Sequence, residues 1–412
     1  SLTDPYNKML LFGRDSNGLV TLITDPLNRT IGLDYDGSGR IIGVTNAMNR
    51  TTQFQYDTND NVTRIEDADS GITRYEYSSG LNDSSGLLDR LYNARNHMTD
   101  FSYDSRARLT GVTNPLNQTR GYQYDSANHL ITATKADGAA ISFEYDALGR
   151  MTKKNLPGDP VTFAYDLDNN LTSAEDGDSK VQMEYDPNGL TLKVIQTDKV
   201  ALISSEIRYE YDPNGNRTKM TLAGVPAFVW SYTYDNLNRL TNITNPQSQN
   251  FSFGYDNLGR RVRLGYPNGI ETLYAYDDAS QLTSVIHKKI ASLVVVASAT
   301  YTYDDAGNRL TKVDGAGRHD YVYDNLNQMT AASHPVSSAI RVKNEVFVYD
   351  KVGNRISDAS RSYSYDSANR IQNANGKIYE YDLNGNRVSI ADPILGGVSY
   401  GFDVQDQTVS IV

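Results

Sequence analysis

The sequence predicts an all-β protein in which tandem β-hairpins form one continuous, spiralling sheet that coils into a curved strip. Three observations carry this prediction. A Tyr-Asp pair recurs along almost the whole chain of 412 residues, each pair follows alternating apolar residues and precedes a turn, and no stretch shows convincing helical periodicity. Length alone would suggest two or three domains. The repeat instead predicts a single array over residues 1–412, with about 18 hairpins and with 1–34 and 398–412 as atypical end repeats.

The Tyr-Asp pairs follow one another mostly at steps of 20 or 21 residues. Their tyrosines are Tyr35, Tyr56, Tyr103, Tyr124, Tyr145, Tyr165, Tyr185, Tyr211, Tyr234, Tyr255, Tyr276, Tyr303, Tyr323, Tyr349, Tyr365 and Tyr381. Degenerate copies at Tyr77-Ser78 and Phe402-Asp403 keep the rhythm. Chance does not produce such a series, so each copy is interpreted as one structural unit.

The first half of each copy is a predicted strand with the pattern aromatic-x-Tyr. Phe54-Gln55-Tyr56 is an example, and Leu33 or Met183 replaces the first aromatic residue in two copies. Residues two apart in a strand point to the same face, so both apolar positions should lie on one side of the sheet. Stacked hairpins would then align these side chains into two ladders.

A turn of the pattern Asp-x-x-Gly-Arg or Asp-x-x-Gly-Asn follows the strand. The Asp carboxylate can accept hydrogen bonds from backbone N–H groups of the turn, and the Gly can adopt positive φ without steric cost. Asn238 and Asn369 replace this Gly in two of the copies. The predicted structural repeat residues are Tyr35, Asp36, Gly39, Tyr145, Asp146, Gly149, Tyr211, Asp212, Gly215, Tyr255, Asp256, Gly259, Tyr303, Asp304, Gly307, Tyr381, Asp382 and Gly385.

The second half of each copy is a β-branched, alternating segment that predicts the returning strand. Residues 108–115 and 239–246 are examples, and each ends at a proline, which cannot donate to a strand ladder. A short link containing Gly or Asn leads to the next copy. About 36 strands at roughly 4.8 Å each would make a strip about 170 Å long, and sheet twist predicts that such a strip coils.

Composition excludes several classes of protein. A net charge of −11 argues against nucleic-acid binding, which needs a basic face. No apolar run approaches 18 residues, so no membrane span is predicted; the longest candidate, residues 290–297, has the length of a strand. The chain contains no Cys, and it begins at Ser1 without Met or a signal peptide, which suggests an excised fragment whose targeting signal lies elsewhere.

The sequence offers no convincing catalytic, cofactor or metal site. None of the histidines has a paired spacing, and His129 takes the Arg position of the repeat; the five are His97, His129, His287, His319 and His334. The Asp/Asn-rich turns 166–170 and 57–61 lack the Glu that completes a helix–loop–helix calcium site, which favours turn capping. The Arg after the turn Gly is expected to pair with the Asp of the neighbouring copy. Asn-x-Thr/Ser acceptor patterns, as at Asn28, follow from the composition of the repeat.

The Tyr-Asp-x-x-Gly-Arg-Leu-Thr consensus resembles the YD repeat of the rearrangement-hotspot (Rhs) family. This family is related to the C component of insecticidal toxin complexes and to teneurin shells. The resemblance covers residues 15–403 and implies a continuous, spiralling sheet that forms a curved or hollow, β-cage-like shell. It also implies a C-terminal toxin inside the shell, in a secreted or cell-surface bacterial protein. Toxin-bearing members end their shell with an Asp-Pro-x-Gly-Leu element. Residues 392–396 do not match its spacing, whereas 186–190 match its letters within the array.

The sequence therefore predicts a non-enzymatic shell or scaffold that encloses a C-terminal toxin or other cargo polypeptide. One alternative is a surface module that uses exposed tyrosines to bind carbohydrate or a cell-surface protein, because flat polar aromatic rings suit sugar stacking. A second alternative is an enzyme with its site in the longer links, 78–100 and 277–300, although neither carries an evident acid/base pair.

Overall fold

The computed structural model describes residues 1–78, 86–335 and 344–412, and all of its regular elements are β-strands. Strands pair antiparallel with their neighbours in chain order, so the chain is one long meander. A 33-stranded sheet contains β1 to β33, and a 6-stranded sheet contains β34 to β39. An isolated bridge between Ser357 and Ser362 lies at the junction of the two sheets. This architecture matches the predicted all-β meander.

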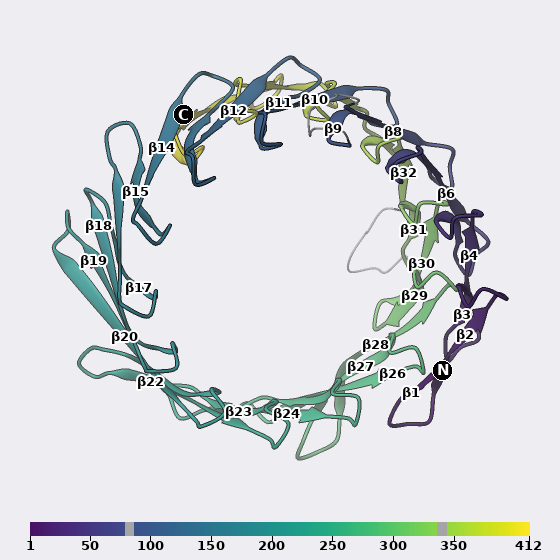
Figure 1. Cartoon of the computed structure of the whole chain (residues 1–412). Coiled ribbons are helices and arrows are strands. Elements are labelled where there is room, and N and C mark those ends of the chain that lie inside the picture. The colour runs from purple at the N-terminus through teal and green to yellow at the C-terminus, as the bar shows by residue number, and fades with distance from the viewer. Residues whose placement is uncertain (79–85, 336–343) are drawn as a thin grey trace.

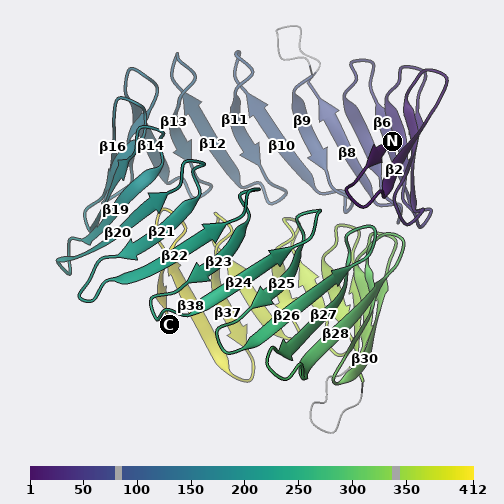
Figure 2. The same cartoon turned by 90° about the horizontal axis from the view of Figure 1, so that it is seen from below.

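The strip makes a ring-shaped spiral whose ends overlap (Figure 1). Figure 2 shows two tiers, with the N-terminal strands above the C-terminal strands. We call β1 to β15 the first arm, β16 to β23 the connecting arc, and β24 to β39 the second arm. The sheet does not close on itself, because β1 and β39 pair with one neighbour each among the described strands.

Strands of the first arm are mostly five or six residues long. They are β1 (Leu2–Thr3), β2 (Met9–Arg14), β3 (Val20–Thr24), β4 (Thr30–Tyr35), β5 (Ile41–Thr45), β6 (Thr51–Tyr56), β7 (Val62–Glu66), β8 (Ile72–Tyr77), β9 (Leu88–Tyr92), β10 (Met98–Tyr103), β11 (Leu109–Thr113), β12 (Thr119–Tyr124), β13 (Leu130–Thr134), β14 (Ala140–Tyr145) and β15 (Met151–Asn155).

The connecting arc includes longer strands. They are β16 (Val161–Tyr165), β17 (Leu171–Glu175), β18 (Ser179–Tyr185), β19 (Thr191–Asp198), β20 (Ile203–Tyr211), β21 (Arg217–Leu222), β22 (Phe228–Tyr234) and β23 (Leu240–Thr244).

The second arm runs beneath the first. Its strands are β24 (Asn250–Tyr255), β25 (Arg261–Gly265), β26 (Ile270–Tyr276), β27 (Leu282–Lys289), β28 (Val295–Tyr303), β29 (Arg309–Asp314), β30 (Gly317–Tyr323), β31 (Met329–Ser333), β32 (Glu345–Tyr349), β33 (Arg355–Asp358), β34 (Tyr363–Tyr365), β35 (Ile371–Ala374), β36 (Lys377–Tyr381), β37 (Arg387–Asp392), β38 (Gly396–Phe402) and β39 (Thr408–Ile411).

The wall is thin and has almost no fully buried apolar interior. Its accessible surface is 24364 Å², whereas a compact protein of 45.7 kDa would expose about 16,000 Å². Only Leu156 and Ala332 are buried apolar side chains among the described residues. Stability must therefore come from the half-buried aromatic face and from contacts between consecutive hairpins, as in a solenoid.

Two corrections concern the predicted links. Residues 277–300 are not an irregular link, because they contain β27 and most of β28, which pair as a long hairpin. The apolar run 290–297 is not one strand, since residues 290–294 form the turn and β28 begins at Val295. Within the other link, 78–100, residues 79–85 lie outside the described part of the chain, and β9 and the start of β10 occupy much of the rest.

Candidate functional site: the repeat joint and the seam

Each Tyr-Asp copy ends in a five-residue turn, which we call the YD turn. In residues 36–40, Asp36 N donates to Arg40 O and Gly39 N donates to Asp36 O, both at 3.0 Å. The carboxylate Oδ1 of Asp36 accepts the N–H groups of Ser38 and Arg40 at 2.9 and 3.0 Å. Positive φ at the fourth residue is characteristic of this hairpin turn, which joins a tight turn to a one-residue bulge.

The predicted Asp and Gly residues occupy these turns in every copy that was singled out. Oδ1 of the Asp accepts one or two turn N–H groups at Asp36, Asp146, Asp212, Asp256, Asp304 and Asp382. The φ angles lie between +78° and +92° at Gly39, Gly149, Gly215, Gly259, Gly307 and Gly385. The mid-array element at residues 186–190 is also an ordinary YD turn, with Oδ1 of Asp186 accepting from Asn188 N and Leu190 N.

The Arg at the fifth turn position joins consecutive copies through several contacts, as Arg40 shows. Arg40 binds Oδ2 of its own Asp36, with Nε at 2.7 Å and Nη2 at 2.7 Å. Its Nη1 donates to the main-chain oxygen of Asp57 in the next copy at 3.0 Å. Its guanidinium also lies 4.8 Å from the centre of the Tyr56 ring, a cation–π contact. Its Nη1 also binds Oδ1 of Asp60 in the next copy at 2.7 Å, which confirms the predicted pairing for this Arg. Arg150 binds Asn169 Oδ1 at the equivalent place, so the ion pair forms only where the fourth turn residue is Asp.

These contacts lower the pKa of the turn carboxylates. For Asp36 and Asp146 the largest cause is the N–H of the fifth turn residue, and the guanidinium of that residue adds to it. Where Asn replaces Arg, as at Asn61, the side-chain amide donates to Oδ2 of Asp57 and is the largest cause of the lowered pKa. The carboxylate is thus held ionised as a turn cap.

In most copies the hydroxyl of the second aromatic residue makes a hydrogen bond that the sequence reasoning missed. The hydroxyl of Tyr145 donates to Leu130 O, in the preceding hairpin, at 2.9 Å. Equivalent bonds of 2.7 to 2.9 Å are made by Tyr35, Tyr211, Tyr255, Tyr303 and Tyr381. The signal was present in the sequence, because this position is nearly always Tyr whereas the first position also accepts Phe, Leu or Met. Burial raises the pKa of Tyr145, so the hydroxyl remains a donor.

The link between hairpins is a second turn of the same geometry, which we call the link turn. In residues 114–118, Oδ1 of Asn114 accepts the N–H groups of Leu116 and Gln118 at 2.9 and 3.1 Å, and Asn117 has φ +59°. The sequence predicted only a short link after the proline. Because consecutive turns alternate, YD turns lie on one edge of the strip and link turns on the other.

The two arms meet along a seam in which link turns of the first arm contact YD turns of the second arm. Arg95 shows the pattern: its Nη1 donates to Asp366 O at 3.3 Å and to Asn369 Oδ1 at 3.2 Å. Lys135 binds Asp406 Oδ1 at 2.5 Å and Val404 O at 3.0 Å. Further seam pairs are Lys8–Asp278, Arg29–Gln281, Arg50–Asn327, Asp69–Asn325 and Asp137–Asn384. Cations mostly come from the first arm and oxygen acceptors mostly from the second.

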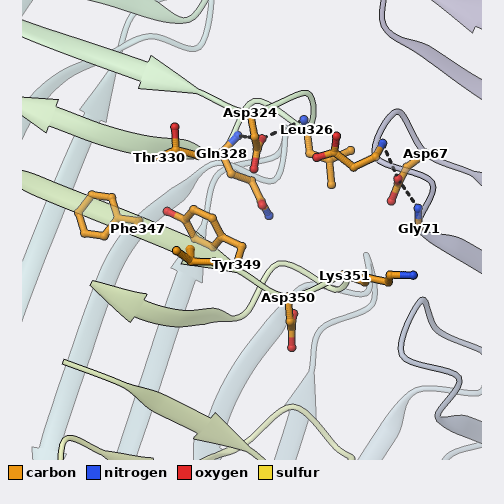
Figure 3. Close-up of a pocket in the computed structure, with 12 residues that line it drawn as sticks. Asp67, Gly71, Asp324, Leu326, Gln328, Thr330, Phe347, Tyr349, Asp350 and Lys351 are labelled. Atoms are coloured by element: carbon orange, nitrogen blue, oxygen red, sulfur yellow. Dashed lines mark hydrogen bonds between the residues drawn. The ribbon is translucent and has the colours of Figure 1, made fainter. Parts of the chain in front are cut away.

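Three clefts open along this seam, with volumes of about 370, 490 and 500 Å³. Figure 3 shows the first, between the link turn 67–71 and the second-arm residues 324–330 and 347–351. Asp324 and Gln328 lie on one side of it and Tyr349 lies below them (Figure 3). The clefts are lined by carboxylate, amide and guanidinium groups with a few apolar side chains.

The histidines and the candidate calcium turns take structural positions. His129 fills the Arg place, with Nδ1 2.9 Å from Oδ2 of Asp125 and its ring stacked on Tyr145 at 4.7 Å. His319 and His334 bring their Nδ1 atoms to 2.8 Å of each other. In residues 1–78, 86–335 and 344–412, no three His, Cys, Asp or Glu side chains are arranged to hold a metal ion. Both oxygens of Asp166 are bonded within its own turn.

Comparison with known proteins gives two family matches. The teneurin YD-shell model matches residues 139–318, and the RHS repeat model matches residues 14–51, 35–72 and 103–140. No curated protein sequence matches the chain. No helix of the described residues has the length and apolar character to cross a membrane.

Solved toxin-complex structures share the fold at low sequence identity. The TcdB2–TccC3–Cdc42 complex superposes with a TM-score of 0.70 at 13% identity, over 96% of this chain. A Photorhabdus luminescens Tc holotoxin pore gives 0.69 at 14% identity over 97%. TcdB2–TccC3 without its hypervariable C-terminal region gives 0.50 at 13% identity over 97%, covering 28% of that chain. This chain spans 27% of the length of each of the first two.

Proposed function

Because the chain belongs to the Rhs/YD-repeat family, we propose that it forms part of the wall of a shell that encloses a polypeptide cargo, without catalytic activity of its own. The observation that carries this proposal is the seam. Contacts between residues 247 to 277 positions apart hold the second arm beneath the first. A thin strip held in a two-tier ring is suited to surrounding another molecule.

The proposed mechanism is containment by a wall built from one repeated joint. In most copies the Tyr hydroxyl ties the hairpin to the preceding one, the Asp carboxylate holds the YD turn, and the Gly or Asn supplies positive φ. Residues 1–412 act as one array in this proposal, including the end segments 1–34 and 398–412. Each joint is made between consecutive hairpins, so the same contacts recur along the whole wall.

The proposed cargo is a C-terminal toxin or another polypeptide of the same protein. TccC3, one of the similar solved proteins, has a hypervariable C-terminal region. By family resemblance we extend that arrangement to this chain, and with it a bacterial, secreted or cell-surface location. Since the chain spans about a quarter of those proteins, the proposal concerns the whole polypeptide of which this wall is a part.

The alternative of an array-wide carbohydrate surface has less support from the geometry. Such a surface needs free tyrosine ring faces, but the rings at the second position are half-buried and donate their hydroxyls to the backbone. In several copies a guanidinium also covers the ring, as Arg239 covers Tyr255 at 4.9 Å. The tyrosines thus serve the wall itself.

Small-angle X-ray scattering tests the open ring, and protease protection tests containment. A compact protein of 412 residues should have a radius of gyration of about 22 Å. We expect a clearly larger value and a distance distribution weighted to long vectors. In the whole polypeptide, cargo should resist protease while the wall is folded. A radius near 22 Å, or cargo cleaved as fast as an isolated cargo segment, would count against the proposal.

A further inference from the structure

His319 and His334 form a largely buried pair in the second arm, on the edge of the strip that carries the link turns. The register of β30 and β31 places Asp320 opposite Ser333, so His319 and His334 are the next residues to face each other. Their Nδ1 atoms are 2.8 Å apart, and their rings are inclined at 70°. Each side chain is only 12% exposed. Containment does not use this pair.

The second nitrogen of each ring faces a carboxylate. Nε2 of His319 is 3.4 Å from Oδ1 of Asp314, and Nε2 of His334 is 3.6 Å from Oε2 of Glu345. The ammonium of Lys312 is the largest cause that holds the pKa of Asp314 well below its usual range, so Asp314 is an ionised acceptor. The distance of 3.6 Å is too long for a hydrogen bond, and Nε2 of His334 is buried without a hydrogen-bond partner among the described residues.

Two neutral imidazole rings have too few N–H groups for this arrangement. Each neutral ring carries one N–H. The contact between the two Nδ1 atoms uses one of these groups, so a single N–H remains for two Nε2 atoms that both face carboxylates. One Nε2 lone pair must then point towards a carboxylate, and the unpaired Nε2 of His334 fits that position. A cation between the two Nδ1 atoms removes the conflict, because both rings can then carry their N–H at Nε2.

We propose that His319 and His334 bind one Zn²⁺ ion through their Nδ1 atoms, with Asp314 and Glu345 as the acceptors that orient the two rings. Imidazole nitrogen is a common zinc ligand, and a metal-binding histidine usually donates its other N–H to a carboxylate, a carbonyl or water. At Zn–N distances of about 2.0–2.1 Å, a tetrahedral ion needs two nitrogens about 3.3 Å apart, so the pair has to open by only about 0.5 Å from its 2.8 Å separation. Water completes the coordination.

The two nitrogen donors select the class of metal. Ca²⁺ and Mg²⁺ prefer oxygen ligands, whereas neutral imidazole suits Zn²⁺ and similar transition metals. The carboxylates of Asp314 and Glu345 lie at the far nitrogens of the rings, and no group of three side chains in the described ranges converges on a metal. The site therefore has two protein ligands, and the bound ion joins β30 to the residue that follows β31. This site is separate from containment, because it needs no cargo.

The test is titration of the whole chain with ZnCl₂, followed by calorimetry and by NMR of protein labelled with nitrogen-15 at histidine. The chain has five histidines, so each imidazole can be followed separately. We expect one zinc site per chain and large shifts of Nδ1 in two imidazoles only, whereas MgCl₂ and CaCl₂ should leave the imidazole signals unchanged. His334→Phe keeps a flat ring but removes one of the two ligands, so it should abolish saturable zinc binding.

Glu345→Gln tests the orienting role with little risk to the fold, because the side chain of Glu345 is 52% exposed. The variant should weaken zinc binding by about tenfold or more, with the melting temperature of the zinc-free protein unchanged. His129→Asn is the matched control. It removes a histidine that lies beside a carboxylate elsewhere, and Asn already holds this turn position at Asn61, so zinc binding should stay as in the wild type.

Four results would overturn the proposal. They are the absence of saturable zinc binding, wild-type binding by either His334→Phe or Glu345→Gln, loss of binding in His129→Asn, and imidazole signals of the pair that move with pH but not with zinc. The last result would mean that the pair holds a proton alone.

Discussion

The hydroxyl of the second aromatic residue should account for a measurable part of the stability of the wall. We consider a variant in which five well-separated tyrosines are changed to Phe, which keeps the ring and removes the donor. The five hydroxyls donate to main-chain oxygens of the preceding hairpin at 2.7 to 2.9 Å; they belong to Tyr35, Tyr145, Tyr211, Tyr255 and Tyr303. Each such bond is worth about 1 kcal/mol net, so the loss is about 5 kcal/mol if the sites are independent.

Differential scanning calorimetry converts this loss into a temperature shift. An unfolding entropy of about 2.1 cal/mol/K per residue gives about 0.9 kcal/mol/K for 412 residues, so the melting temperature should fall by about 6 °C. Tyr124→Phe is the matched control. Tyr124 has the same place in the repeat and lies under Arg108 at 4.9 Å, but no described residue accepts a bond from its hydroxyl. If the five-fold variant melted no lower than the control, the hydroxyl would not be joining the hairpins.

Three further perturbations test the turns, the carboxylates and the seam. Gly259 has φ +79°, and an added Cβ would meet no heavy atom within 4 Å, so only the backbone conformation disfavours a side chain there. Gly259→Val should therefore lower the free energy of unfolding, measured by urea titration, by about 1 to 3 kcal/mol. Gly259→Asn should lower it clearly less. The pKa of Asp358 is lowered to about 2, mainly by the Tyr363 hydroxyl. The ionised Asp358 therefore contributes fully to the free energy of unfolding above the unfolded pKa of about 3.9, and this contribution is lost as pH falls towards 2. The urea midpoint should fall between pH 6 and pH 2. A midpoint that rose on acidification would contradict this. Combined Arg95→Ala and Lys135→Ala should separate the arms and increase the radius of gyration in X-ray scattering, while an unchanged value would show that these contacts do not hold the seam.

Local features of the repeat could be predicted from sequence because each depends on residues within one hairpin. The alternation Phe54-Gln55-Tyr56 gives two half-buried side chains on one face and an exposed Gln55 on the other. The turn pattern gives its geometry directly, since the Asp oxygen and the positive-φ residue are only two to four positions from their partners. The period of the repeat and the residues of its turn were therefore sufficient to predict the strands and the YD turns.

Contacts between copies were harder to predict from the sequence. The partner of the Arg was predicted only in part, because a sequence pattern shows which charges are available but not which carboxylates are already occupied. Arg40 pairs with Asp60 of the next copy, whereas the carboxylate of Asp57 is held by Asn61. The seam was missed for a different reason. Partners such as Arg50 and Asn327 are 277 residues apart, and that offset depends on the accumulated twist and curvature of all intervening strands. No single repeat encodes it.

The choice between Gly and Asn at the fourth turn position connects the local structure of one hairpin with the contacts between hairpins and between arms. On conformational grounds alone Asn is a tolerated substitute for Gly, and its φ of +61° to +71° at Asn128, Asn327 and Asn369 is consistent with that. However, its side-chain oxygen also accepts a bond from a neighbouring turn. Within one arm Arg108 donates to Asn128 at 3.1 Å, and across the seam Arg95 donates to Asn369 at 3.2 Å.

A glycine at this position satisfies the turn but offers no such acceptor. Asn therefore adds a contact point for either edge of the strip, to the next hairpin along the chain or to the tier above. The same turn can then stabilise a hairpin, join it to its neighbour and dock one arm on the other. Because one turn makes all three kinds of contact, an array of degenerate repeats of about 21 residues can form a wall two tiers high without a thick apolar core.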